Sequence, residues 1–198
     1  MSESPRRESP LAGVGAQPLA GDVATVCLAE RPFLGQLNLR GEVSSKAFVD
    51  AVTGVLGGPL PVQPNTVAVL GQVRVFWLGP DEWLISTPRD AQSELKITLQ
   101  AVLEGMHFAL SDVSSGQTTL VVSGPEADAL LSKSCTLDLH PRAFAPGQCA
   151  QTLMAGSTVL LSRFDRAHGP EFELVVRRSF ADYFWRCLAD GAQEYQPA

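Results

Sequence analysis

The sequence predicts an α+β protein in which helices cover one face of mainly antiparallel sheets. One observation is the order of the elements: segments with the apolar pattern of strands, often in pairs, separate four segments with helical periodicity. Another is the length, since 198 residues accommodate two strand–helix–strand units. We therefore expect one domain built from two ferredoxin-like halves. The expected boundaries are 1–22 for a flexible tail, about 23–105 and 106–192 for the halves, and 193–198 for a short tail.

The first half begins with two extended segments and a helix. Segments 23–29 and 33–39 are rich in apolar residues, as strands are. Ser44 or Ser45 can accept backbone N–H bonds at the start of the helix that follows, and Gly57 ends it. The apolar residues of this helix share one face; they are Phe48, Ala51, Val52, Val55 and Leu56.

Two more strands and a second helix complete the first half. Segments 66–70 and 72–78 flank a glycine and predict a hairpin or one bulged strand. A turn with Pro and two acidic residues leads to a short buried strand at 83–85. Thr87 is expected to be the N-cap of the second helix, with Pro88 as its first residue.

The second half repeats this order without a residue-level repeat. A short helix is expected to end near residue 132, and 133–150 has no periodic pattern. Ser179 and Asp182 form a capping-box pattern at the start of a strongly amphipathic last helix. The expected strands are 107–113, 117–122, one or two within 151–163, and 171–177.

The composition argues against several classes of partner. The chain has 15 basic and 21 acidic residues and a net charge of −6, whereas nucleic acids and anionic membranes attract cationic surfaces. No apolar run approaches the roughly 18–20 residues of a membrane helix. The four cysteines form no C-x-x-C and no zinc-ligand spacing. We therefore expect no nucleic acid, no membrane and no metal, and a reducing, cytoplasmic location.

Few residues carry a pattern of catalysis, and we expect no catalytic residue on this chain. The sequence has no phosphate loop, no HExxH and no GxSxG. Asp112 precedes a Ser-Ser-Gly turn; its carboxylate can serve as a ligand or proton acceptor, or it can bond the local backbone and fix the turn. Arg142 follows His140-Pro141; its guanidinium can contact an anion, or it can belong to a plain surface turn.

Four longer segments carry more specific motifs. They are LGPDEWLI (78–85), DVSSGQTTLVVSGPEADALL (112–131), LDLHPRAFAPGQCAQTLMA (137–155) and FELVVRRSFADYFWRCL (172–188). In this order they resemble the gamma-subunit family of heterotetrameric sarcosine oxidase. The resemblance covers roughly residues 23–192, and its most specific parts are the third and fourth segments.

Shorter elements resemble the wider family of folate-binding aminomethyltransferases, which includes the T-protein of glycine cleavage. The matching elements are Asp112-Val113-Ser114, Val122-Ser123-Gly124-Pro125, Ser162-Arg163, Phe172-Glu173-Leu174 and Trp185. The sequence departs from that family where FDRAHGP replaces a Gly-rich loop, and it lacks the remaining half of such a transferase. The resemblance implies an aminomethyltransferase-like fold used as a structural subunit.

The sarcosine oxidase resemblance also implies an activity for the complex. Its alpha, beta, gamma and delta subunits oxidise sarcosine to glycine and hydrogen peroxide, and the one-carbon unit leaves as formaldehyde or as 5,10-methylene-tetrahydrofolate. This chain would dock on the alpha subunit and carry no cofactor, with the flavins, NAD, zinc and the main folate site on the partners. Asp112 and Arg142 would be contacts to folate or to a partner. An alternative stays open, a stand-alone folate-dependent aminomethyl- or methyltransferase that uses Asp112.

Overall fold

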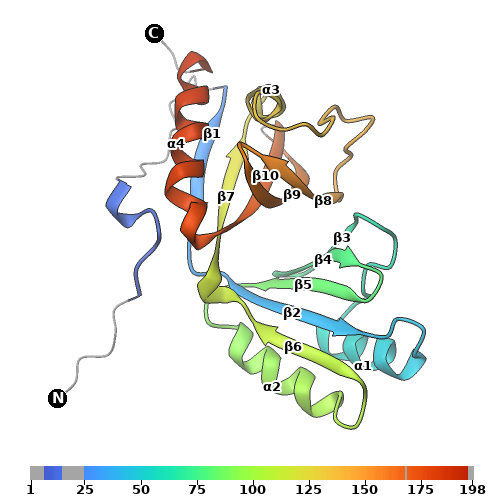
Figure 1. Ribbon diagram of the computed structural model, residues 1–198. Helices are drawn as coiled ribbons and strands as arrows, with labels where there is room; N and C mark the ends of the chain where they lie inside the picture. Colours follow the sequence, from blue (N-terminus) through green and yellow to red (C-terminus); the bar gives the residue numbers. More distant parts are fainter. Residues whose placement is uncertain (1–6, 15–24, 168, 196–198) are drawn as a thin grey trace, which may run out of the picture.

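The computed structural model describes residues 7–14, 25–167 and 169–195. Two five-stranded sheets are stacked between two pairs of helices (Figure 1), and all strand pairs are antiparallel. The layers run from α1 and α2 through the two sheets to α3 and α4. The predicted α+β class with mainly antiparallel sheets is therefore confirmed.

Sheet B, the lower sheet in Figure 1, has the strand order β3-β4-β5-β2-β6. Helices α1 (Lys46–Leu56) and α2 (Gln92–Val102) cover its outer face and share a buried core with it. Alternate residues of the strands, such as Trp83 and Ile85, point into this core. Its strands are β2 (Gly35–Gly41), β3 (Val67–Leu70), β4 (Val73–Gly79), β5 (Glu82–Thr87) and β6 (Phe108–Asp112).

Sheet A, the upper sheet, has the order β1-β7-β10-β9-β8. Helices α3 (Ala127–Ser132) and α4 (Ala181–Ala192) cover its outer face, and Phe184 and Leu188 of α4 are buried there as the helical spacing predicts. Its strands are β1 (Cys27–Arg31), β7 (Gln117–Ser123), β8 (Cys149–Met154), β9 (Ser157–Arg166) and β10 (Gly169–Arg177).

The sheets exchange strands between the two expected halves of the chain. Strand β1 from the first half pairs with β7 in sheet A, and β6 from the second half pairs with β2 in sheet B. The paired segments β1–β2 and β6–β7 thus cross together from one sheet to the other (Figure 1). A boundary at 105/106 therefore does not coincide with the division between the sheets, because strand pairing is set by contacts distant in the sequence.

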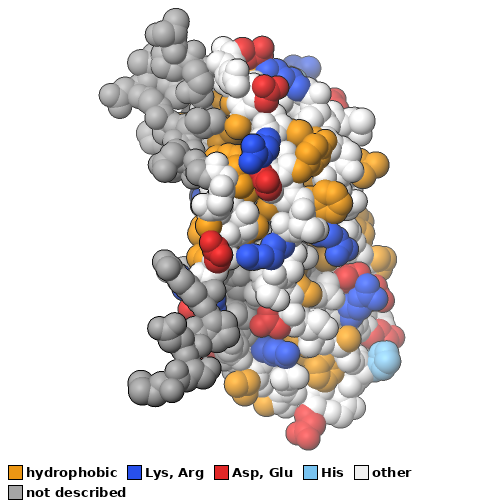
Figure 2. Space-filling view, turned by 60° about the vertical axis from the view of Figure 1, so that its left-hand side comes forward, with side chains coloured by type: hydrophobic (Ala, Val, Ile, Leu, Met, Phe, Trp, Pro, Cys, Tyr) orange, Lys and Arg blue, Asp and Glu red, His pale blue; other side chains and the backbone are white. Residues whose placement is uncertain are grey.

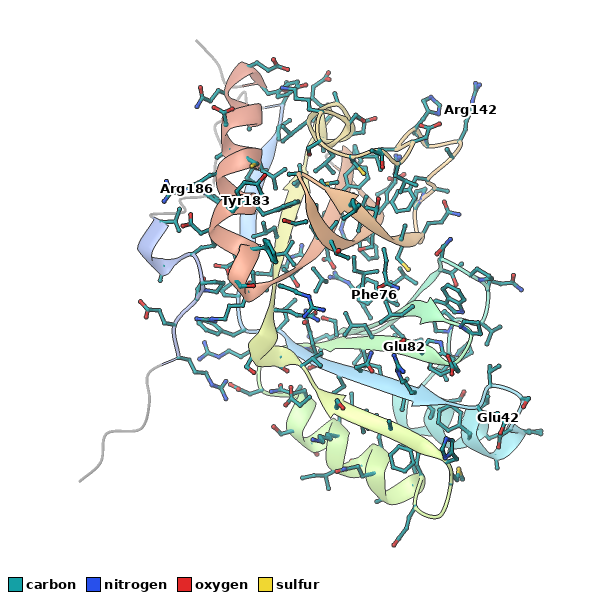
Figure 3. The ribbon with its side chains drawn as sticks, in the orientation of Figure 1. Glu42, Phe76, Glu82, Arg142, Tyr183 and Arg186 are labelled. Atoms are coloured by element: carbon teal, nitrogen blue, oxygen red, sulfur yellow. The ribbon has the colours of Figure 1, made fainter. Side chains whose placement is uncertain are left out.

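A third apolar cluster lies between the inner faces of the sheets. Phe76, which Figure 3 labels between the two layers, packs there with Leu84 of sheet B and with Leu160 and Val175 of sheet A. Cys149 belongs to the same cluster, and burial raises the pKa of its thiol to about 12. Both faces of each sheet are consequently covered over much of their area.

Two expectations about helix caps were wrong. Thr87 lies in β5 opposite Gly35 and caps no helix; α2 begins later, after Asp90 takes a left-handed φ of 66°. Ser179 lies in a 3-10 turn, η3 (Arg178–Phe180), so α4 begins without a side-chain cap. Leu11, within the expected flexible tail, is only 2% exposed because it packs into the core of sheet A beside η1 (Ala12–Val14).

Residues 1–6 and 15–22 of the expected N-terminal tail lie outside the described residues, whereas η4 (Gln193–Tyr195) occupies most of the described C-terminal end. In the described residues, no helix has both the length and the apolar character needed to cross a membrane.

Candidate functional site

A cavity of about 650 Å³ lies where the chain crosses from β6 to β7. The crossing segment forms one wall, because β6 ends at Asp112 and the turn η2 (Ser114–Gly116) leads directly into β7. Residues 7–10 and Arg178 form another wall, and Phe33 and Gln92 lie at the same end of the β2–β5 pair, where Gly35 is opposite Thr87. The cavity is therefore formed by both layers of the molecule.

Asp112 is the one predicted site residue that lines this cavity. Its Oδ1 accepts hydrogen bonds from the backbone N–H of Ser114 at 2.9 Å and from the Ser114 hydroxyl at 2.5 Å. The same hydroxyl oxygen accepts from the backbone N–H of Gln36 at 2.8 Å. The carboxylate thus fixes the turn and anchors it on β2, which is the turn role considered for it from sequence.

Arg142 lies elsewhere, on the loop between α3 and β8. Its backbone N–H donates to Nδ1 of His140 at 3.2 Å, and the backbone N–H of His140 donates to Asp138 at 2.9 Å. Its exposed side chain extends away from the body of the molecule (Figure 3). The structure therefore does not bring Arg142 and Asp112 into one site.

The N-terminal segment (7–14) closes one side of the cavity and touches both layers. Arg7 forms an ion pair with Asp90, just before α2. The Arg178 guanidinium, just after β10, donates to the backbone carbonyl of Glu8 at 2.7 Å. Leu11 anchors the segment in the core of sheet A. No sequence motif signalled this segment, because the surrounding composition is that of a tail.

Two amide side chains in the cavity wall have unused acceptors. Oε1 of Gln92 and Oε1 of Gln117 are buried and have no hydrogen-bond partner among the described residues. Gln92 is only 8% exposed. Sequence reasoning missed both residues, since a single glutamine in a helix start or a strand belongs to no recognised motif.

A charged cluster between the sheets was also missed. Glu173 of β10 is 2% exposed and pairs with Arg31 of β1 and Arg74 of β4, while Glu171 pairs with Arg31 and Arg166. Burial raises the pKa of Glu173, and the positive charges of Arg74 and Arg31 oppose that rise. The cluster joins four strands, β1, β4, β9 and β10, and contributes to the packing of the two layers.

Among the residues that the structure describes, no group of three or more His, Cys, Asp and Glu is placed to hold a metal ion. On the face that contains α4, acidic and basic side chains alternate with apolar patches (Figure 2). Phe180 and Tyr183 at the start of α4 are 46% and 52% exposed.

The two stacked sheets, the crossing strand pairs and the outer helices define a chain with an aminomethyltransferase-type fold. The structure is similar to the glycine cleavage system aminomethyltransferase T from Bartonella henselae, with a TM-score of 0.64 and 14% identity. The match covers 90% of this chain and 56% of that chain. At this identity the similarity concerns the fold alone.

Closer relatives specify the family. The sarcosine oxidase gamma subunit family matches residues 40–194. The chain is 35% identical over 193 residues to the sarcosine oxidase subunit gamma of Corynebacterium sp. (strain P-1), covering 96% of this chain and 91% of that protein. It is 38% identical over 191 residues to the same subunit of an Arthrobacter species, with the same coverage. The chain belongs to the sarcosine oxidase gamma subunit family, as the sequence motifs predicted.

A solved complex agrees with this assignment. A chain of the heterotetrameric sarcosine oxidase from Corynebacterium sp. U-96 matches with a TM-score of 0.84 and 32% identity. The match covers 97% of both chains. The whole described architecture, including the crossing strands, is therefore comparable with that of a chain from an assembled oxidase.

Proposed function

We propose that this chain is the gamma subunit of a heterotetrameric sarcosine oxidase and that its role is to support assembly. The observation that carries the proposal is similarity over 96–97% of the chain both to proteins named gamma subunits and to a chain of a solved heterotetramer. Its partners are then alpha, beta and delta subunits, with alpha as the main contact. The complex oxidises sarcosine to glycine and hydrogen peroxide.

The chemistry of the complex belongs to the partner chains in this proposal. Flavins, NAD, zinc and the main folate site lie on them, and the one-carbon unit leaves as formaldehyde or as 5,10-methylene-tetrahydrofolate. The hydrogen bonds of Asp112 support a structural role for this chain, because both bonds that its Oδ1 accepts come from Ser114 and stabilise the local turn. We further propose that the exposed Arg142 guanidinium contacts a partner rather than folate, since it lies away from the cavity.

Co-expression with the partner subunits tests the assembly role. We expect the chain to co-elute with an alpha-type subunit during size-exclusion chromatography, and omission of this chain to lower the yield of assembled complex. Arg142→Ala should weaken co-elution, whereas Arg186→Ala, a matched loss of an exposed arginine on α4, should leave it unchanged. A chain that stays monomeric beside soluble alpha, beta and delta subunits would rule the proposal out.

One observation favours the alternative of a folate-dependent transferase, namely the cavity of about 650 Å³ beside Asp112. Titration of the isolated full chain with tetrahydrofolate separates the two functions. Micromolar binding that disappears in Asp112→Ala but persists in Asp138→Ala would support the transferase. The assembly role predicts no saturable binding at these concentrations.

A further inference from the structure

The outermost strands β3 of sheet B and β8 of sheet A meet on one side of the molecule (Figure 1). The backbone N–H of Val67 donates to the carbonyl of Gly147 at 2.8 Å, and the N–H of Cys149 donates to the carbonyl of Asn65 at 2.8 Å. These two bonds join the sheets where β3 and β8 begin. We call the surface formed by residues 62–70 and 139–154 the β3–β8 edge.

The segments that form this edge contain no acidic residue. Residues 51–80 and 139–164 include no Asp and no Glu, although the chain has 21 acidic residues and a net charge of −6. The negative charge of the chain is therefore carried by its other segments, and the β3–β8 edge differs from them in electrostatic character.

Large apolar side chains are exposed along the same edge. Val62, Val69 and Leu153 are 54%, 56% and 60% exposed. Outer strands of soluble proteins commonly carry charges that prevent pairing with other chains, and Glu30 in β1 and Asp112 in β6 fit this rule. Strands β3 and β8 contain no charged residue. Depletion of charge around exposed apolar side chains is typical of the centre of a protein–protein interface.

A buried arginine holds the loop that leads into β8. Arg163 is 5% exposed and donates to the backbone carbonyls of Leu139 and Phe144, both at 3.3 Å. The side chains of Leu139 and Phe144 are themselves buried. Arg142 lies between these two anchors; its exposed guanidinium forms no ion pair or hydrogen bond with another described residue. A loop that is already ordered loses little conformational entropy on binding, so Arg142 is well placed to contact another chain.

We propose that this chain docks through the β3–β8 edge on the alpha-type subunit, and that the docked surface of that subunit is apolar with a carboxylate opposite Arg142. Apolar side chains of the partner cover Val62, Val69 and Leu153, and the carboxylate accepts hydrogen bonds from the guanidinium of Arg142. The inference rests on the function proposed above and adds to it the docking face and the chemistry of the partner surface.

A second copy of this chain matches the edge less well. In a two-fold dimer the same surface faces itself. Each copy would then supply Arg142 and, from the segments that form the edge, no Asp or Glu to compensate it. A different chain can place a carboxylate there, and complementary charge of this kind selects the correct partner.

Competition for the partner subunits tests the docking face. The parent chain and a variant, each with its own affinity tag, are co-expressed with the alpha, beta and delta subunits, and the ratio of the two chains in the purified complex is measured. Val69→Glu and Leu153→Glu each place a charge in the covered surface, and each should lower the share of the variant at least about tenfold. Ile97→Glu is the matched control, because Ile97 is 69% exposed on α2, which already carries Glu94. It should compete equally with the parent.

The predicted carboxylate has its own test. Arg142→Glu should lower the share of the variant more than Arg142→Ala, because it repels the partner carboxylate, and Arg142→Lys should retain most of the parent share. Hydrogen exchange locates the contact independently. Amides of β8 should exchange more slowly in the complex than in the free full chain, whereas those of α2 should exchange at the same rate in both. Thermal unfolding of each free variant, with a Tm near that of the parent, shows that it is folded.

The outcomes separate this inference from the function on which it rests. If folded Val69→Glu and Leu153→Glu chains compete equally with the parent in a complex that assembles normally, the docking face is wrong and the gamma-subunit function stands. A parent chain that joins no complex would overturn both. Self-association of the free chain that Leu153→Glu abolishes would show that a second copy occupies the edge, which would also overturn the inference.

Discussion

Arg74 of β4 donates to the carboxylate of Glu173 in β10, so one ion pair joins the two stacked sheets. The Glu173 side chain is 2% exposed and that of Arg74 is 21% exposed. Arg31 of β1 donates to the same carboxylate. Because the acid is almost fully buried, its charge depends on these two partners for compensation.

Removal of one of these partners should destabilise the fold. We expect Arg74→Met to lower the free energy of unfolding by about 2–3 kcal/mol, since it leaves a buried carboxylate with Arg31 alone. Adding Glu173→Gln to Arg74→Met should recover part of this loss, because the uncompensated charge is then gone. Urea denaturation of the parent, both single variants and the double variant measures the coupling. If the loss of unfolding free energy in the double variant equals the sum of the losses in the two single variants, Arg74 and Glu173 are not coupled and their ion pair does not stabilise the contact between the sheets.

The stability of Arg74→Met should depend on pH differently from that of the parent protein. Burial already raises the pKa of Glu173, and loss of Arg74 removes a charge that opposes this rise. The folded state then binds a proton at pH values where the unfolded chain has lost it, so unfolding becomes harder as pH falls through this window. The stability deficit of Arg74→Met should therefore shrink between pH 7 and pH 5. A deficit that stays constant or grows over this range would contradict the assignment to Glu173.

Two glycines should respond in opposite directions to alanine. A Cβ at Gly41 would lie 2.3 Å from the ring of Phe48, which is 1% exposed, whereas a Cβ at Gly54 in α1 meets nothing within 4 Å. We expect Gly41→Ala to destabilise by about 1–3 kcal/mol through overpacking. Gly54→Ala should stabilise by about 0.5–1 kcal/mol, because alanine is the better helix former. Thermal unfolding of the parent and both variants measures these changes in stability. A Gly41→Ala variant as stable as the parent would mean that the Phe48 ring can move aside.

The start of α1 provides a matched pair of serines. The sequence left Ser44 and Ser45 open as the cap, and in the structure Ser45 accepts from the backbone N–H of Phe48 at 3.4 Å. Ser44 instead donates to the side chain of Glu42 at 2.6 Å. Ser45→Ala should cost about 0.5–1 kcal/mol and Ser44→Ala less than about 0.5 kcal/mol, measured by urea denaturation. The reverse order would exclude Ser45 as the cap.

Helix ends and the alternation of buried residues along strands could be predicted from sequence, because they depend on residues that are close together in the chain. Gly57 ends α1 in a left-handed conformation with a φ of 73°, as a glycine after a helical stripe indicates. In β10, Phe172 and Leu174 are buried, which agrees with the alternation of apolar residues along the strand expected at 171–177. It did not predict that Glu173, on the opposite face, is also buried, because that depends on a second sheet being stacked there.

Features that depend on distant contacts were not predictable from a single sequence. The exchange of β1 and β6 between the sheets follows from pairings of residues far apart in the sequence, such as Cys27 with Ser123 and Leu37 with Asp112. The candidate site shows the same limit. The turn role of Asp112 was one of two roles that the Ser-Ser-Gly turn after it left open from sequence, whereas the packing of Leu11 into the core of sheet A appears only in three dimensions.

Substitution of Asp112 separates its turn role from a chemical one. Asparagine keeps an oxygen that can accept from the backbone N–H and hydroxyl of Ser114, whereas alanine removes both bonds. We therefore expect Asp112→Ala to cost about 1 kcal/mol of unfolding free energy and Asp112→Asn less than about 0.5 kcal/mol. Asp138→Ala is the control, since Asp138 accepts a comparable turn bond from His140 at 2.9 Å on another loop. Sarcosine oxidation by complexes that contain Asp112→Asn should match the parent rate, because a turn needs the acceptor and not the negative charge. A folded, assembled Asp112→Asn complex with a tenfold slower rate would show instead that the charge itself takes part in the reaction.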